Sequence, residues 1–164
     1  MQFKRRTKKP VNKKVRNATP LKYHNILFKS NLEVHCYKAL KDANLNFQYE
    51  KHRYELISPF TFTNTSYELF KRKGKKTFGQ QRNNIRGITY TPDFVGEYHG
   101  QMFIIETKGN PNDAFPIRWK LFKRYLLINN IDANLYMPRN QKQINETIEI
   151  IKADERLLQD KKSK

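Results

Sequence analysis

The residues Asp93, Glu106 and Lys108 stand among apolar neighbours in the segment YTPDFVGEYHGQMFIIETK, which spans residues 90–108. An antiparallel hairpin through this segment would place Asp93 opposite residues 103–106 and within reach of Glu106. Two neighbouring carboxylates repel each other and do not both stay ionised unaided. Mg²⁺ relieves that repulsion, because it binds one or two carboxylates and keeps positions for water and substrate phosphate.

Lys108 adds a basic group beside this pair of carboxylates. Side chains alternate along a strand, so Glu106 and Lys108 point to the same face. An ammonium group there can orient or deprotonate a water molecule and offset charge on a phosphate, which predicts phosphodiester hydrolysis. Each residue also has an ordinary explanation. Asp93 would cap the turn after Pro92, and Glu106 with Lys108 would form a surface ion pair that contributes under about 1 kcal/mol.

Pro92-Asp93-Phe94 and, after a spacer, Glu106-Thr107-Lys108 resemble the signature of the PD-(D/E)XK nuclease superfamily. The chain is similar to small phage-type endonucleases of that superfamily, such as the Holliday-junction resolvase endonuclease I. The resemblance covers residues 21–137 and implies an α/β fold with a restriction-endonuclease-like core, a mixed β-sheet flanked by helices. It also implies that Asp93, Glu106 and the carbonyl of Thr107 bind Mg²⁺, with Mn²⁺ as a substitute, and that Lys108 serves the attacking water.

The segment FKSNLE, Phe28 to Glu33, resembles the first-helix motif of the same superfamily. That resemblance implies Glu33 as a further catalytic residue, either an acidic ligand of the metal or a water-mediated contact. Ser30 and Glu33 also have the spacing of a capping box, which satisfies backbone donors at a helix start and needs no metal. The sequence leaves both interpretations of Glu33 open.

The chain is strongly basic, with 33 Lys and Arg against 15 Asp and Glu and a net charge of +18 over 164 residues. Such an excess opposes compaction by self-repulsion, so we expect a polyanionic partner, and the nuclease resemblance implies that this partner is DNA. Residues 1–20 hold eight Lys and Arg and no acid, which predicts a disordered basic arm along phosphates or a solubilising tail.

A second basic cluster lies in residues 58–87, which show no regular hydrophobic period. We expect these residues to be a long hairpin connection or insertion within a nuclease domain of residues 21–160. Their basic side chains predict a DNA-binding loop that orders on contact and whose binding weakens steeply with salt. The cluster consists of Lys71, Arg72, Lys73, Lys75, Lys76, Arg82 and Arg86.

Hydrophobic periodicity predicts the elements that must position these residues. A helix is expected over residues 30–44, and the turn 96–100 is expected to join the two central strands. Strands are expected at 45–57, 88–95, 101–108 and 131–137, and further helices at 113–129 and 140–158. This order predicts one α/β domain with a mixed sheet.

The helix expected over residues 113–129 has Asp113 as its N-cap and Pro116 in its first turn. By the resemblance, Arg118 or Lys120 would hold a phosphate near the metal, and the alternative is a solvated basic face. The apolar stripe expected beneath that face consists of Ile117, Leu121, Tyr125 and Ile128.

Other features limit the function classes. A lone cysteine, Cys36, excludes an intrachain disulfide, and the histidines have no cysteine partners at zinc spacing. The chain has no apolar run of about 18 residues and no signal peptide, so we expect no membrane partner. The expected setting is the host-cell cytoplasm for a phage protein, or association with the virion.

The sequence therefore predicts a Mg²⁺-dependent DNA endonuclease. By analogy with the resembled family, it would act on branched or junction DNA as a homodimer. The alternative is a non-catalytic DNA-binding or virion-associated protein on a nuclease fold.

Overall fold

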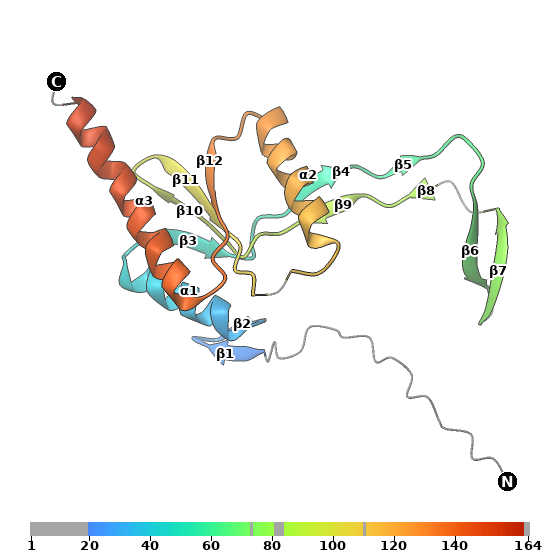
Figure 1. The fold of residues 1–164 in the computed structure, drawn as a ribbon, viewed down its shortest axis with the longest axis horizontal. Helices are drawn as coiled ribbons and strands as arrows, with labels where there is room; N and C mark the ends of the chain where they lie inside the picture. Colours follow the sequence, from blue (N-terminus) through green and yellow to red (C-terminus); the bar gives the residue numbers. More distant parts are fainter. Residues whose placement is uncertain (1–19, 73, 81–83, 110, 163–164) are drawn as a thin grey trace, which may run out of the picture.

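The computed structural model describes residues 20–72, 74–80, 84–109 and 111–162 (Figure 1). Nearly all of the predicted basic arm, residues 1–20, lies outside this part of the chain, as do Lys73 and Arg82. No helix in the described part is long and apolar enough to cross a membrane.

A four-stranded mixed sheet forms the centre of the fold, with the order β3-β10-β11-β12. The strands are β3 (Asn46–Tyr49), β10 (Phe94–Tyr98), β11 (Gln101–Ile105) and β12 (Ala133–Tyr136). Strand β10 pairs antiparallel with both β3 and β11, whereas β12 runs parallel to β11. The expectation of an α/β domain with a mixed sheet is confirmed.

Three helices flank this sheet (Figure 1). They are α1 (Asn31–Asp42), α2 (Phe115–Ile128) and α3 (Gln141–Lys162). Phe94, Phe103 and Ile105 pack with α1 and α3 in one hydrophobic cluster. Val95 and Ile104 pack with α2 in a second cluster. Alternate residues of β10 and β11 therefore face different helices, which is the period of two that a sheet covered on both faces requires.

The helix predicted over residues 30–44 is present as α1, and its residues Cys36 and Leu40 are fully buried. Burial raises the pKa of the Cys36 thiol, as expected for a structural cysteine. A short hairpin, β1 (Leu21–Tyr23) with β2 (Ile26–Phe28), precedes this helix and was not predicted.

The predicted stripe of α2 is wrong, because Ile117 and Ile128 are 64% and 63% exposed. The buried stripe consists of Phe115, Trp119, Phe122 and Leu126. Large aromatic rings bury more apolar area than isoleucine, so they set the rotation of the helix. The expected N-cap Asp113 is also wrong. The helix begins after Ala114, and Asn112 Oδ1 accepts a hydrogen bond from the Phe115 amide at 3.0 Å.

Gly96 lies inside β10 and not in a turn, contrary to the expectation for residues 96–100. It stands opposite Phe103, and a Cβ atom on it would lie 2.3 Å from the Phe103 ring and 2.4 Å from the Asn46 carbonyl oxygen. Close cross-strand approach therefore requires glycine here. The turn itself is formed by His99 and Gly100, both with positive φ, as in a tight two-residue hairpin.

The strands expected at 45–57 and 88–95 are each broken in two. The breaks release β4 (Tyr54–Ile57) and β9 (Ile88–Tyr90) from the central sheet, and these two strands pair with each other. They begin a long two-stranded arm, residues 54–90, that extends away from the sheet (Figure 1). The arm continues through β5 (Phe60–Thr61) with β8 (Asn84–Ile85) and ends in β6 (Tyr67–Arg72) with β7 (Lys75–Gln80).

Residues 58–87 were expected to be a long hairpin connection or insertion with a loop that orders on contact, but no individual strands were predicted in them. The structure forms the paired strands β6 and β7 there. The two strands pair residue by residue, from Tyr67 opposite Gln80 to Arg72 opposite Lys75. In a packed strand, apolar residues that face the core alternate with polar residues that face solvent. The apolar residues of β6 and β7 are mostly exposed and pack on no core in the described part of the chain, so the sequence lacked this usual strand signal.

Candidate active site

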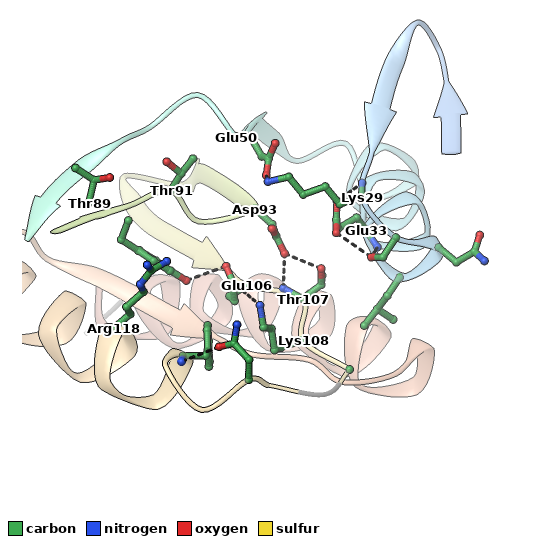
Figure 2. A pocket seen from close by; sticks show the side chains of 17 residues that line it. Lys29, Glu33, Glu50, Thr89, Thr91, Asp93, Glu106, Thr107, Lys108 and Arg118 are labelled. Atoms are coloured by element: carbon green, nitrogen blue, oxygen red, sulfur yellow. Dashed lines mark hydrogen bonds and ion pairs between the residues drawn. The ribbon is translucent and has the colours of Figure 1, made fainter. Parts of the chain in front are cut away.

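A cavity of about 660 Å³ opens where β10 begins, β11 ends and α1 and α2 start. Asp93, Glu106, Thr107 and Lys108 all line it. Figure 2 shows these four residues grouped together, with Glu33 on the α1 side and Arg118 on the α2 side. The structure therefore brings every residue of the predicted catalytic set to one cavity.

Asp93 lies directly before β10 and is 7% exposed. Its Oδ2 accepts two hydrogen bonds from Thr107, one from the backbone N–H and one from the hydroxyl, each at 2.7 Å. No described residue donates a hydrogen bond to Oδ1. The aspartate is therefore fixed through one oxygen, and its other oxygen is available to a ligand.

Glu106 follows β11 and is 5% exposed. Beyond the end of the strand, the N–H groups of Glu106 and Lys108 still donate to the carbonyls of Tyr136 and Pro138 at 3.0 and 3.1 Å. Strand-like alternation thus continues through residue 108, which leaves the Thr107 amide to face Asp93. The inference that Glu106 and Lys108 share one side rests on this same alternation.

The Glu106 carboxylate is held by two different groups. Its Oε2 accepts a hydrogen bond from the Tyr90 hydroxyl at 2.8 Å, and its Oε1 lies 3.4 Å from Lys108 Nζ. Lys108 Nζ also lies 4.6 Å from the centroid of the Phe115 ring. The ammonium group is therefore placed beside the acid pair and faces the same cavity.

The two buried carboxylates destabilise each other's charged form. Burial and the charge of Glu106 raise the pKa of Asp93 from 3.8 to about 8, although the Thr107 hydrogen bonds oppose the shift. Burial also raises the pKa of Glu106, against the lowering effects of Tyr90 and Lys108. A neighbouring cation would favour the ionised form of both groups.

Glu33 is 5% exposed and makes the contacts of a helix cap. Its carboxylate accepts hydrogen bonds from the Lys29 amide at 2.9 Å, the Ser30 hydroxyl at 2.8 Å and the Tyr49 hydroxyl at 2.6 Å. Ser30 is the N-cap of α1 and accepts from the Glu33 amide at 3.3 Å. The residue also lines the cavity, so a capping role and proximity to the acid pair coexist.

The donors available for a metal are few. In the described part of the chain, no group of three or more His, Cys, Asp and Glu side chains is arranged to hold a metal ion. The relevant set is the carboxylate pair of Asp93 and Glu106. Mg²⁺ retains several waters and binds through one or two carboxylates, so this oxygen set fits Mg²⁺ better than zinc.

The predicted nucleic-acid contacts lie in two places. Arg118 lines the cavity, whereas Lys120 is exposed on α2 and does not line it. Lys71, Lys75, Lys76 and Arg86 are exposed on the arm, and none of them lines the cavity. Lys73, Arg82 and the side chain of Arg72 lie outside the described part of the structure.

Sequence reasoning missed Tyr90, Tyr49 and Lys29. Tyr90 lies sixteen positions from its partner Glu106, and Tyr49 sixteen from Glu33, and no local spacing connects either pair. Lys29 forms an ion pair with Glu50, and both line the cavity. Only the adjacency of Lys29 to the predicted cap Ser30 offered a signal.

Comparison with known protein families gives a match over most of the chain. Residues 13–139 match a family described as "Protein of unknown function (DUF1064)". Since the match spans most of the chain, the chain belongs to this family. No curated protein and no solved structure matches it.

Proposed function

We propose that this member of the DUF1064 family is a Mg²⁺-dependent endonuclease that hydrolyses phosphodiester bonds in DNA. The observation that carries the proposal is the buried pair of Asp93 and Glu106, which lines one cavity together with Lys108. Burying two like charges costs several kcal/mol unless a partner offsets it. Lys108 offers one positive charge, and a divalent cation would offset the remaining charge when both carboxylates are ionised.

The carboxylates of Asp93 and Glu106 would hold the metal, and the Thr107 carbonyl would complete the protein ligands by the family resemblance. When bound, Mg²⁺ supplies a Lewis acid that polarises the phosphate and lowers the pKa of a bound water. Thr107 orients Asp93, and Tyr90 orients Glu106. Glu33 is not needed as a ligand, because its carboxylate already accepts three hydrogen bonds.

Lys108 would act on the attacking water and on charge that develops in the transition state. Its ammonium is 3.4 Å from Glu106 and faces the cavity, so it lies within reach of a water bound beside that carboxylate. It can hold this water by a hydrogen bond and stabilise negative charge on the phosphate oxygens. Arg118 would hold a phosphate at the α2 side of the cavity.

The surroundings support DNA as the substrate. The mixed sheet between helices supports a restriction-endonuclease-like core, and the net charge of +18 favours a polyanion. A junction substrate, a homodimeric enzyme and a phage setting follow from the family resemblance. The rival proposal is a non-catalytic DNA-binding protein. It is less favourable because a pure binder would lose affinity by burying two acids where phosphates approach.

A cleavage assay tests the proposal. The protein is incubated with a four-way junction, a linear duplex and a single strand, in Mg²⁺ and in EDTA. We expect strand breaks in Mg²⁺, none in EDTA, and preference for the junction. Absence of metal-dependent breaks in all three substrates, with DNA binding intact, would favour the non-catalytic DNA-binding protein.

A further inference from the structure

The outer end of the arm presents an apolar face to solvent. Tyr67, Leu69 and Phe78 are 62%, 63% and 70% exposed. Leu69 stands directly opposite Phe78, and the Tyr67 and Phe78 rings lie 6.3 Å apart, so all three share one face of the β6–β7 ribbon. In Figure 1 this end of the arm lies far from the central sheet.

The opposite face of the ribbon accounts for the arm's own packing. Phe70 lies on that face and is half-buried, with its ring 3.7 Å from the position of a Cβ on Gly79. Gly79 lies beside this ring, at a distance that a Cβ atom would also tolerate. The ribbon therefore uses Phe70 for its internal packing and leaves the face with Tyr67, Leu69 and Phe78 open.

The tip of the same ribbon places like charges opposite one another. Lys71 stands opposite Lys76. Directly opposed like charges destabilise an antiparallel pair. No described residue forms an ion pair with Lys71, Lys75 or Lys76. The repulsion between these lysines therefore destabilises the end of the ribbon, and a bound anion would relieve it.

We infer that the end of the arm binds unpaired nucleotides, with bases stacked on Phe78 and Tyr67 and a phosphate between Lys71 and Lys76. Lys71 and Lys76 share the face of the aromatic residues. Lys76 lies two residues from Phe78 along β7, and Lys71 lies two residues from Leu69 along β6, each about 6.8 Å away. Aromatic platforms beside cations are how proteins bind single-stranded segments, because every base offers a face for stacking. A continuous duplex hides those faces.

This inference rests on the proposed function, since it takes DNA as the substrate and specifies DNA with unstacked bases, such as a branch point or a flap. A second copy of the chain is a poorer occupant of the face. Residues 54–90 hold seven Lys and Arg against two acids, so two such arms would repel each other. Charge complementarity therefore selects the nucleic acid.

Binding without cleavage tests the inference. The full chain carrying Asp93→Asn is titrated in EDTA with a fluorescent single strand, a flapped duplex and a blunt duplex. Phe78→Leu keeps an apolar side chain but removes the ring, and Leu127→Ala, at a 78% exposed position on α2, is the matched control. We expect Phe78→Leu to weaken binding of the single strand and the flap about 5- to 100-fold, and of the blunt duplex less than 2-fold.

A second variant tests the cations. Lys71→Gln with Lys76→Gln should reduce the salt slope of log Kd for the single strand by about 1.4, two phosphate contacts at about 0.7 each. Lys142→Gln changes an exposed lysine on α3 and serves as the control, which should leave the slope unchanged. The inference is wrong if these arm variants leave single-strand binding unchanged, weaken all three DNAs equally, or instead lower the dimer fraction in sedimentation. Because no metal is present, its failure is distinct from failure of the nuclease proposal.

Discussion

Thr107 donates two hydrogen bonds to a single carboxylate oxygen of Asp93, both at 2.7 Å. The ladder between β10 and β11 ends with Phe94 opposite Ile105, so this contact extends the pairing of the two strands through a side chain. It anchors Asp93 where the buried charge of Glu106 acts on it. The oxygen not held by Thr107 is the one that a cation would take.

Removal of the Thr107 hydroxyl should weaken metal use. Thr107→Val keeps the shape and the backbone donor but removes one of the hydrogen bonds that lower the pKa of Asp93. We expect the Mg²⁺ concentration for half-maximal cleavage to rise about 10-fold, as for other groups that orient a ligand. Thr89→Val, at another threonine lining the cavity, is the control and should leave it unchanged.

Removal of the Tyr90 hydroxyl should move the pH profile of cleavage. The Tyr90 hydrogen bond lowers the pKa of Glu106, so Tyr90→Phe should shift the acid limb of the profile to higher pH. At pH 7 we expect about a 10-fold slower rate that recovers partly at pH 9. Tyr54→Phe, in the same aromatic cluster, should change neither. A uniform loss of rate at every pH would contradict this role.

The acid pair should destabilise the metal-free protein as pH rises. Unfolded Asp93 releases its proton near 3.8, whereas the folded protein retains it up to about 8. The folded state binds more protons in that window, so stability falls as pH rises through it. In EDTA, Asp93→Asn should therefore be more stable than wild type at pH 8, by at least about 1 kcal/mol, and closer to it at pH 4.

Thermal melts at the two pH values, with Asp42→Asn as the exposed control, measure this difference. The expected rise in Tm at pH 8 is about 2–4 °C or more. Equal stability of wild type and Asp93→Asn across the window would mean that Asp93 is not buried in charged form.

Glu33 should behave as a cap. Glu33→Gln and Ser30→Ala both weaken the hydrogen bonds at the start of α1, so each should lower stability by about 1 kcal/mol. Per folded molecule, cleavage should change less than about 3-fold, because the carboxylate of Glu33 is already occupied. A loss of about 100-fold or more in Glu33→Gln alone, measured well below its Tm, would identify it as a metal ligand instead.

The sequence was sufficient for the site wherever local periodicity decides geometry. Asp93, Glu106 and Lys108 follow from a hairpin with alternating side chains, and the hairpin exists, although Gly96 was assigned to its turn. Phe103 packs over Gly96 from the neighbouring strand, and no pattern in the sequence around Gly96 indicates this contact. The contacts of Tyr90 and Tyr49 with the acids are equally long-range.

Sequence periodicity also failed to predict which face of α2 is buried and that the arm forms paired strands. In α2, both Ile117 and Trp119 lie on apolar helical periods, and only packing against the sheet buries Trp119 and exposes Ile117. In the arm, the pairing of β6 with β7 proceeds without a core, so hydrophobic alternation gives no sign of it. Gly74, which has a positive φ between β6 and β7, is the type of residue that marks a turn there.

The most direct test of the central claim is strand cleavage by four proteins assayed side by side on the same DNA in Mg²⁺. These are wild type, Asp93→Asn, Glu106→Gln and Glu97→Gln, the last changing an exposed acid in the same hairpin. We predict metal-dependent cleavage by wild type and Glu97→Gln, and losses of at least about 100-fold in Asp93→Asn and Glu106→Gln with DNA binding retained. Cleavage by Asp93→Asn and Glu106→Gln at the wild-type rate would contradict the account.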